Sequence, residues 1–396
     1  MTPLPLPPST RMTTYSFIYA VLLSASSSAP TPLYHLYQQL FQLSSGMITL
    51  IFGSYAFALL AALLTFGSLS DHLGRRPLIL LALILNAAAL AIFIDADSGG
   101  MLIVGRVVQG FAMGIAFPTF GAAILDGDKR YGPLLNSLTT FVGLMIGSLS
   151  GGLLVAYAPY PTQLVYVALL IITVVGIATL ALMPETVARQ SGAWAALKPN
   201  VHVPHRARPA LLRVSPVNIA CWSLGGLYLS LMPSLVATVT GIESPVVGAA
   251  VVATLMLSSM VSIFLFGSVP PTRALFVGTS GLMAGVVVTL IGIQQQAVSL
   301  LFLGTAIAGL GFGSIFANVL KIVLPMAESH ERAGLFAAFL VESYLAFSLP
   351  AILAGLAIPV FGLPLTAYTY GAAILALAVI SIAATRGGLP GHTATR

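Results

Sequence analysis

Ionisable side chains are rare in this chain, and the few that interrupt its apolar stretches are the candidates for chemistry. Asp, Glu, Lys and Arg make up 7% of the 396 residues, whereas 58% are hydrophobic. Glu342 is the only acid that we place well inside hydrocarbon. Removal from water disfavours its charged form, so Glu342 is expected to bind a proton near neutral pH and to release it when wetted or approached by a cation. A structural acid, bonded to neighbouring helices or ionised at a wet cytoplasmic mouth, is the alternative.

A buried cation is the second candidate. Arg106 lies some six residues inside an apolar run, where an arginine costs up to about 2.5–3.5 kcal/mol on insertion scales. Gln109, three residues later, shares its helix face. The position predicts that something offsets the cost of Arg106. The alternative is an arginine whose side chain extends to the outer headgroups.

A short charged loop, residues 67–77, is the third candidate. Gly74 can adopt the positive φ of a sharp reversal. Asp71 is placed to face the positive end of a helix dipole, and Arg75 and Arg76 can reach lipid phosphate or a buried acid. Arginines that only anchor the loop in the headgroups would also explain the pattern.

The elements that must position these residues are apolar runs long enough to cross a bilayer. About 20 helical residues span about 30 Å of hydrocarbon, and soluble domains carry roughly 25% charged residues. The composition therefore predicts an integral, multi-pass membrane protein of twelve spans. We expect them at residues 13–33, 46–66, 77–94, 100–124, 133–157, 162–183, 217–238, 245–267, 274–293, 298–322, 334–358 and 365–385.

The distribution of charge predicts the topology. With the amino terminus in the cytoplasm, fifteen of the sixteen cations lie in inner loops, tails and cytoplasmic helix ends, while the outer loops carry only Asp95, Asp97 and Glu243. By the positive-inside rule, both termini are cytoplasmic. We expect the protein in a bacterial inner or plasma membrane. The net charge of +6 is explained by this topology, so no nucleic-acid partner is expected.

The two halves of the chain resemble each other. Phe66-Gly67-Ser68-Leu69 recurs as Phe266-Gly267-Ser268-Val269, and glycines 105, 110 and 114 recur at 304, 309 and 313, at offsets of 200 and 199 residues. The predicted organisation is a cytoplasmic tail (1–12), a six-helix bundle (13–183), a cytoplasmic linker (184–216), a second six-helix bundle (217–385) and a cytoplasmic tail (386–396).

The ordered set Gly-x-x-x-Asp-x-x-Gly-Arg-Arg at residues 67–76 resembles the loop signature of the major facilitator superfamily of secondary transporters, and residues 102–114 resemble its span-four signature. The resemblance implies an all-α membrane fold of twelve transmembrane helices in two pseudo-symmetric six-helix bundles. It also implies a site between the halves that opens to alternate sides as they rock. In this family the span-four arginine is associated with proton coupling, and that role passes to Arg106.

The resemblance further implies that Asp126, at the inner end of span four, meets Arg75. Asp71, Arg75 and Asp126 would then form a conformational latch at the inner face. Asp128 lies two residues away, and the sequence barely separates the two acids. A solvated surface acid is the alternative.

Span five contains Gly143-Leu144-Met145-Ile146-Gly147-Ser148-Leu149-Ser150-Gly151-Gly152, which resembles the antiporter signature of drug exporters. Ser148 stands where that signature has proline. Without the proline ring the helix loses a built-in kink, which weakens the case for export. Packing through glycines explains the remaining residues about as well.

Breaks in spans one and seven indicate a binding cavity. We predict cavity contacts from Gln109, Tyr228, Asn318 and Tyr344, with ordinary packing as the alternative for each.

No catalytic or nucleotide-binding motif is found, and the lone Cys221 excludes an intrachain disulfide. We therefore expect no enzyme activity, no cofactor and no metal. The predicted function is proton-coupled efflux of a small organic molecule by a monomer, with Glu342 and Arg106 coupling the proton and the proton gradient as energy source. An uptake symporter for a metabolite, and a membrane sensor or enzyme on the same fold, are the alternatives.

Overall fold

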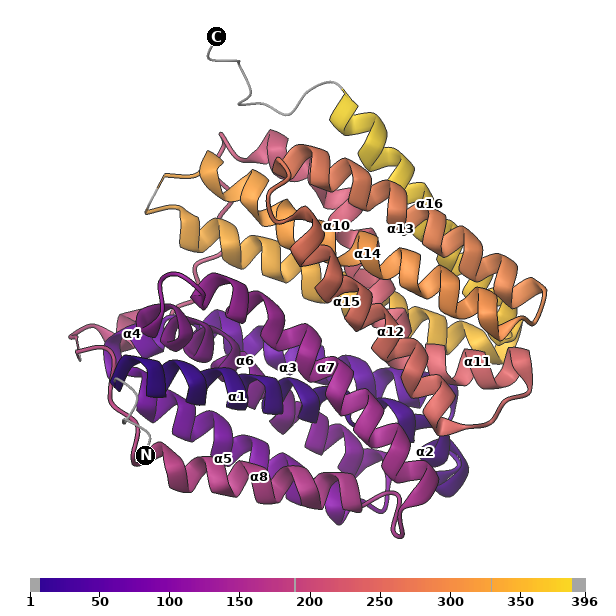
Figure 1. Ribbon diagram of the computed structural model, residues 1–396, viewed down its shortest axis with the longest axis horizontal. Helices are drawn as coiled ribbons and strands as arrows, with labels where there is room; N and C mark the ends of the chain where they lie inside the picture. The colour runs from indigo at the N-terminus through magenta and orange to yellow at the C-terminus, as the bar shows by residue number, and fades with distance from the viewer. Residues whose placement is uncertain (1–7, 189, 329, 387–396) are drawn as a thin grey trace, which may run out of the picture. The chain divides into compact units, whose positions relative to one another are not determined.

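The structure is a computed structural model that describes residues 8–188, 190–328 and 330–386, and all regular secondary structure in these ranges is helical (Figure 1). Nine of the described helices are long and apolar enough to cross a membrane. They are α3 (Ser45–Phe66), α5 (Arg75–Ile94), α6 (Gly99–Gly127), α7 (Gly132–Tyr157), α12 (Pro245–Phe266), α13 (Pro271–Gln294), α14 (Val298–Val323), α15 (Arg332–Phe361) and α16 (Leu363–Arg386).

The remaining three expected spans are shorter or broken. The helix α8 (Leu164–Leu180) has 17 residues, and α1 (Pro8–Ser28) is followed by η1 (Thr31–Leu33) and α2 (Tyr34–Phe41). The helices α10 (Arg208–Ser230) and α11 (Met232–Thr240) form one bent pair at 63°. Prolines lie at both breaks, where a residue without an N–H interrupts helical hydrogen bonding. These helices occupy all twelve predicted places, and the all-α membrane fold is confirmed.

The helices gather into two compact units. One comprises the residues up to Leu33 together with Ser54–Pro199, and the other comprises Tyr34–Gly53 and the residues from Asn200 onward. The same helix pairs pack together within each unit. In the first unit α5 lies along α6 and α1 packs on α7; in the second, α13 lies along α14 and α10 packs on α15.

The stretch expected to be a linker, 184–216, is partly helical. It contains the short α9 (Ala193–Ala196), and α10 begins at Arg208 rather than at residue 217. The earlier start has a local cause, because Pro209 lies in the first turn of α10, where the missing N–H has no helical partner. The predicted tail 386–396 lies outside the described residues except at Arg386, and 1–12 is described only from Pro8.

The repeated glycines mark where helices pack most closely. Gly110 and Gly114 of α6 face backbone atoms of α3, and a Cβ added at Gly309 of α14 would lie 2.7 Å from the carbonyl oxygen of Leu255 on α12. Small residues allow membrane helices to approach to backbone contact. At these positions the contact of α6 with α3 in the first unit is repeated by the contact of α14 with α12 in the second.

Replacing Gly309 with valine is expected to destabilise the second unit. The added side chain would force α14 away from α12, and overpacking of this kind typically costs about 1–3 kcal/mol. Gly100→Val on α6 is the matched control, because a Cβ at Gly100 has nothing within 4 Å. Thermal unfolding in detergent should show a lower midpoint for Gly309→Val alone. Equal midpoints would contradict the contact.

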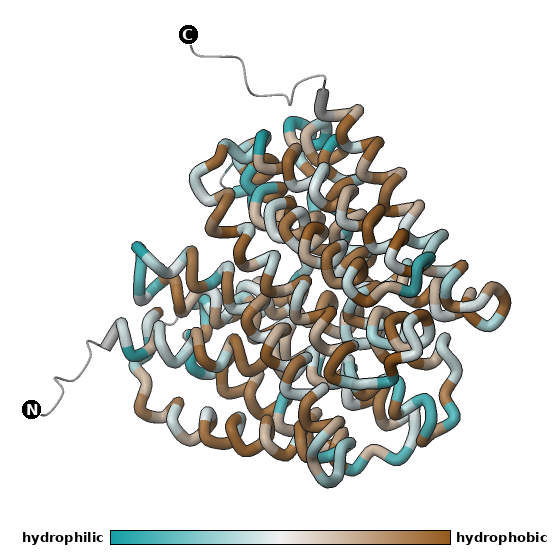
Figure 2. Tube along the Cα trace, turned by 45° about the vertical axis from the view of Figure 1, so that its right-hand side comes forward, coloured by the Kyte–Doolittle hydropathy of each residue, from teal (hydrophilic) through white to brown (hydrophobic). Residues whose placement is uncertain are grey.

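Apolar residues follow the helices and hydrophilic residues concentrate at the connections (Figure 2). Side chains such as Ile171, Val174 and Val175 on α8 are about half exposed. Exposed apolar side chains along spans of this length suit a hydrocarbon surrounding.

Candidate functional site

The charged loop forms an ion cluster inside the first unit. Arg75 is the first residue of α5 and is 6% exposed. Its Nη1 donates to Asp71 Oδ1 at 2.5 Å and to Ser70 Oγ at 2.7 Å, and its Nε donates to Asp126 Oδ2 at 3.1 Å. Gly74, with φ of +99°, makes the reversal between α4 (Leu69–Leu73) and α5. The structure therefore brings Asp71, Arg75 and Asp126 together.

Asp126 and Asp128 have different partners. Asp128 Oδ1 accepts the backbone N–H groups of Arg130 and Tyr131, both at 2.8 Å, and so closes the turn before α7. Asp126 lies at the end of α6, where it meets Arg75. The Arg76 side chain does not join the cluster, since its Nη2 donates to the Ala181 carbonyl at 3.2 Å.

Glu185 is a further member of this cluster, and its place there was not evident from the sequence. Its carboxylate accepts the backbone N–H of Arg75 at 2.8 Å and that of Arg76 at 3.0 Å, so it caps the amino-terminal end of α5. Thr186 also donates its hydroxyl to Asp126 at 3.2 Å. One feature of the sequence could have indicated this role. Glu185 is the single acid at the start of a basic linker, and that linker follows a span expected to end on the same side of the membrane as the N–H groups at the start of α5.

Loss of the Glu185 carboxylate is expected to loosen the linker from the loop. Capping interactions contribute about 0.5–2 kcal/mol, which corresponds to roughly a two- to thirtyfold rise in the open population. Limited trypsin digestion should therefore cut the linker of Glu185→Ala faster by that factor. The control is Glu243→Ala, in the exposed connection between α11 and α12. Unchanged cleavage would mean that the cap does not hold the linker.

Arg106 lies in a polar network within the first unit. The side chain is 1% exposed, and its Nη1 donates to the Ser27 carbonyl at 2.8 Å and to Gln109 Oε1 at 2.7 Å. Gln109 Nε2 donates in turn to the Ser26 carbonyl at 2.9 Å. The guanidinium carbon lies 4.5 Å from the ring centroid of Tyr55. Arg106 thus turns inward, and the alternative of a side chain extended to the headgroups is not observed.

The network extends beyond the predicted residues. Asn86 on α5 donates to Ser26 Oγ at 3.4 Å and to Thr173 Oγ1 on α8 at 3.2 Å. Ser26 and Ser27 lie at the carboxyl end of α1, just before its break, where helical carbonyls lack N–H partners. These free carbonyls explain why Arg106 and Gln109 bond to the α1 backbone.

Two features of Arg106 are unusual for a buried cation. Among the described residues, no ion pair includes it, and its Nε has no hydrogen-bond partner. Neutral acceptors and the Tyr55 ring therefore balance its charge only in part.

Glu342 lies in the second unit and is held by neutral donors. Ser215 Oγ donates to its Oε2 at 2.5 Å, and Asn218 Nδ2 donates to its Oε1 at 2.8 Å. Asn218 also reaches Ser343 Oγ at 3.1 Å. Ser215 and Asn218, three residues apart, share one face of α10. The ion pairs of the described residues do not include Glu342, which is half-buried.

The other predicted cavity residues do not form one group. The Tyr228 hydroxyl lies 2.9 Å from Thr305 Oγ1, and Asn318 Nδ2 donates to the Ser314 carbonyl of its own helix at 2.8 Å. The Tyr344 ring lies 5.0 Å from that of Trp222. Both Tyr228 and Asn318 are almost fully buried. These contacts are ordinary packing and hydrogen-bonding contacts within the second unit, and a role of the three residues in substrate binding stays a prediction.

The glycines of span five pack α7 against α1. A Cβ at Gly143 would lie 2.6 Å from the Val21 carbonyl oxygen, and one at Gly151 would lie 2.9 Å from that of Ala29. Ser148 is buried, and proline occurs in α7 only in its first turn.

Comparison with solved structures identifies the fold. The chain is similar to a bacterial homolog of the human lysosomal transporter Spinster, with a TM-score of 0.76 at 13% identity over 97% of this chain and 98% of that one. The nucleoside transporter NupG, as a point mutant, gives 0.72 at 12% identity over 96% and 100%. The POT family transporter PepTSo gives 0.72 at 12% identity over 97% and 99%.

Sequence comparison gives a more limited match to a curated relative and a broad match to a family. A segment of this chain is 26% identical over 152 residues to the multidrug resistance protein MdtL of Shewanella sp. (strain ANA-3). The aligned segment covers 37% of this chain and 38% of that protein. The profile of the Major Facilitator Superfamily matches residues 16–339. This chain therefore belongs to the Major Facilitator Superfamily and is a multi-pass membrane transport protein rather than an enzyme.

Proposed function

We propose that the protein is a proton-coupled antiporter that exports a small organic molecule by alternating access. The observation that carries the proposal is the setting of Glu342, a carboxylate on a membrane-spanning helix whose described partners are all neutral. Without a fixed cation to hold it ionised, such a group can change protonation during a transport cycle. The partial likeness to a multidrug resistance protein supports export.

The partners of Glu342 suit both of its protonation states. A hydroxyl can donate or accept, so Ser215 can donate to the carboxylate and can accept from the protonated carboxyl after rotation. Asn218 continues to donate to the other oxygen. Uptake and loss of the proton would then leave no buried polar atom without a partner.

Arg106 is proposed to tune the cycle. Its guanidinium stays charged at any physiological pH, and its field in a low-dielectric setting reaches farther than it would in water. It would favour proton release, or attract a negatively charged group, whenever the transport cycle brings such a group near. The incomplete set of partners at Nε supports this role over a purely structural one.

The ion cluster of Asp71, Arg75 and Asp126 is proposed to act as a conformational latch, with Glu185 as an added member. The cluster joins the α4–α5 loop, α6 and the linker within the first unit. A motion that separates these elements would have to break charge-assisted bonds.

We also propose that both termini are cytoplasmic and that the protein is a monomer. Labelling from outside would test the position of the termini, and light scattering in detergent would test the oligomeric state.

The test of export begins with finding a substrate. A panel of antibiotics, dyes and nucleosides is screened for thermal stabilisation of the purified protein, and the stabilising compounds are followed by counterflow in proteoliposomes. In cells, collapse of the proton gradient should raise accumulation of a true substrate by several fold. Reduced accumulation would show uptake. If none of the stabilising compounds shows counterflow, the protein does not transport the compounds of that panel.

An uptake symporter for a metabolite is the second candidate. Ser148 favours it, because α7 lacks the internal proline of the drug-exporter signature and its glycines are used for packing against α1. The direction of accumulation in the same cells separates the two candidates.

A further inference from the structure

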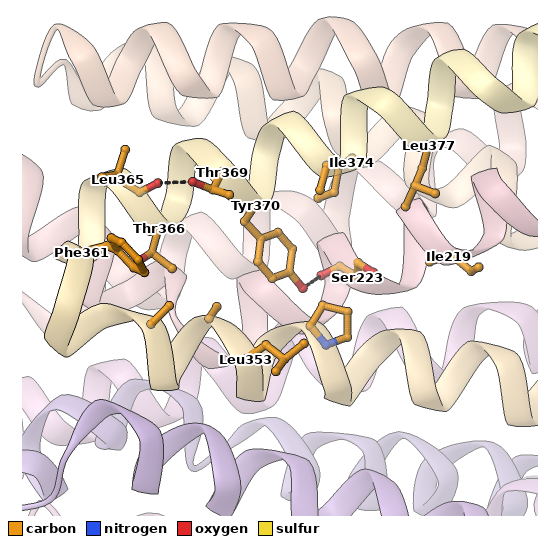
Figure 3. A pocket seen from close by; sticks show the side chains of 14 residues that line it. Ile219, Ser223, Leu353, Phe361, Leu365, Thr366, Thr369, Tyr370, Ile374 and Leu377 are labelled. Carbon is orange, nitrogen blue, oxygen red and sulfur yellow. Dashed lines mark hydrogen bonds between the residues drawn. The ribbon is translucent and has the colours of Figure 1, made fainter.

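A hollow of about 560 Å³ opens in the second unit between α10, α15 and α16 (Figure 3). We call it the lateral slot. One wall runs from Pro350 to Phe361 on α15 and the other from Leu365 to Leu377 on α16, while Ile219 and Ser223 of α10 form its floor. Within each wall the lining residues recur every three or four positions and so share one helix face.

The lateral slot is long and narrow along the helices. The α16 wall, from Leu365 to Leu377, extends about 18 Å at a rise of about 1.5 Å per residue, and the α15 wall is similar. It begins beside Gly362, the turn that joins the two helices at one membrane face. Since one leaflet contributes about 15 Å of hydrocarbon, the slot runs through roughly one leaflet.

The lining offers nothing to a polar ligand. None of its 14 residues is Asp, Glu, Lys, Arg or His. The Thr366 hydroxyl donates to the carbonyl of Gly362, in the turn before α16, at 2.8 Å, and the Thr369 hydroxyl donates to the Leu365 carbonyl at 2.9 Å. The Tyr370 hydroxyl donates to the Ser223 carbonyl at 2.8 Å. The Ser223 hydroxyl donates to the Ala346 carbonyl at 3.0 Å. That carbonyl lies four residues before Pro350, which has no N–H to offer it.

The rim of the lateral slot continues the lipid-facing surface. Leu353, Phe361 and Leu365 are 65%, 61% and 53% exposed, whereas Ala354 and Ile374 beneath them are buried. A groove that is apolar, as long as one leaflet and open to the bilayer fits a hydrocarbon chain better than a compact solute. We propose that the lateral slot binds one acyl chain of a membrane phospholipid.

The bound chain would contact α10, the helix whose Ser215 and Asn218 donate hydrogen bonds to Glu342 of α15. Ile219 in the floor follows Asn218, which donates to the Glu342 carboxylate. An acyl chain in the slot therefore packs against the same turn of α10 and supports the position of Asn218. The inference rests on the membrane fold and not on the direction or coupling of transport.

Photolabelling tests the proposal on the full chain in nanodiscs that contain phosphatidylcholine with a diazirine on one acyl chain. Labelled peptides should come chiefly from the walls on α15 and α16. Ala354→Phe, which fills the slot, should lower this labelling at least tenfold. Val360→Phe is the matched control, because Val360 is on the same helix, is 75% exposed and lies outside the slot. It should label as the native chain does.

Other outcomes decide against the proposal. Equal labelling of Ala354→Phe and Val360→Phe, or labelling spread evenly over other exposed spans such as α8, would overturn it. Labelling that is displaced by a transported compound would identify a substrate entrance instead. If Ala354→Phe fails to fold, as judged by thermal unfolding, Ala357→Phe on the same wall takes its place and is read in the same way.

Discussion

Replacing Glu342 with glutamine is expected to abolish transport driven by a pH gradient while leaving exchange of one substrate molecule for another. The amide has the size of the carboxyl group and can still bond to Ser215 and Asn218, whose side chains now hold the carboxylate at 2.5 and 2.8 Å. It cannot bind or release a proton at any pH from about 5 to about 9. Gradient-driven flux should fall at least tenfold, and exchange should stay within about twofold.

The measurement compares both kinds of flux in the same proteoliposomes, with Glu243→Gln, in the exposed connection between α11 and α12, as control. A Glu342→Gln protein that keeps its response to the pH gradient would remove Glu342 from the proton pathway. Loss of both fluxes together, with a normal unfolding midpoint, would assign Glu342 to substrate binding.

Replacing Arg106 with glutamine is expected to stop transport with a modest loss of stability. The buried guanidinium costs up to about 2.5–3.5 kcal/mol, while each of its hydrogen bonds to Ser27 and Gln109 returns about 1.5–3 kcal/mol. The two bonds outweigh the cost by at most about 3 kcal/mol, and a glutamine that keeps one neutral hydrogen bond regains about 1 kcal/mol, so stability should fall by about 2 kcal/mol or less. Transport should fall at least tenfold, because the amide that replaces the guanidinium carries no positive charge.

Arg273→Gln, which removes an exposed cation of α13, is the matched control for charge alone. Flux and thermal unfolding are measured on both variants. A severe drop in the unfolding midpoint of the Arg106 variant would show that the arginine serves the fold. Native flux in that variant would exclude a role in coupling.

The positions of the spans followed from the sequence because the bilayer imposes one dominant constraint. Apolar runs of sufficient length had to be helical, and α12, expected at 245–267, is found at Pro245–Phe266. The ion pair of Arg75 with Asp126 was expected from the family resemblance, and the geometry places the two side chains together. The repeated glycines, which indicated that the two halves resemble each other, lie where membrane helices pack closely.

Contacts between residues distant in sequence could not be predicted in this way. Nothing in the pattern paired Glu342 with Ser215 and Asn218 on α10, because serine and asparagine occur in many spans. Glu185 was assigned to a linker, and its role as a cap depends on where that linker folds back. A break in span seven was expected from the sequence, but its angle of 63° depends on packing.

Direct observation of proton movement tests the central claim. Proteoliposomes filled with a pH-sensitive dye receive a stabilising compound on one side, with no pH gradient imposed. Proton-coupled exchange predicts that inward movement of the compound alkalinises the lumen in the native protein, and that Glu342→Gln shows neither net inward movement of the compound nor a change in lumen pH. Compound movement in the native protein with no change in lumen pH would contradict proton coupling, and acidification would contradict exchange.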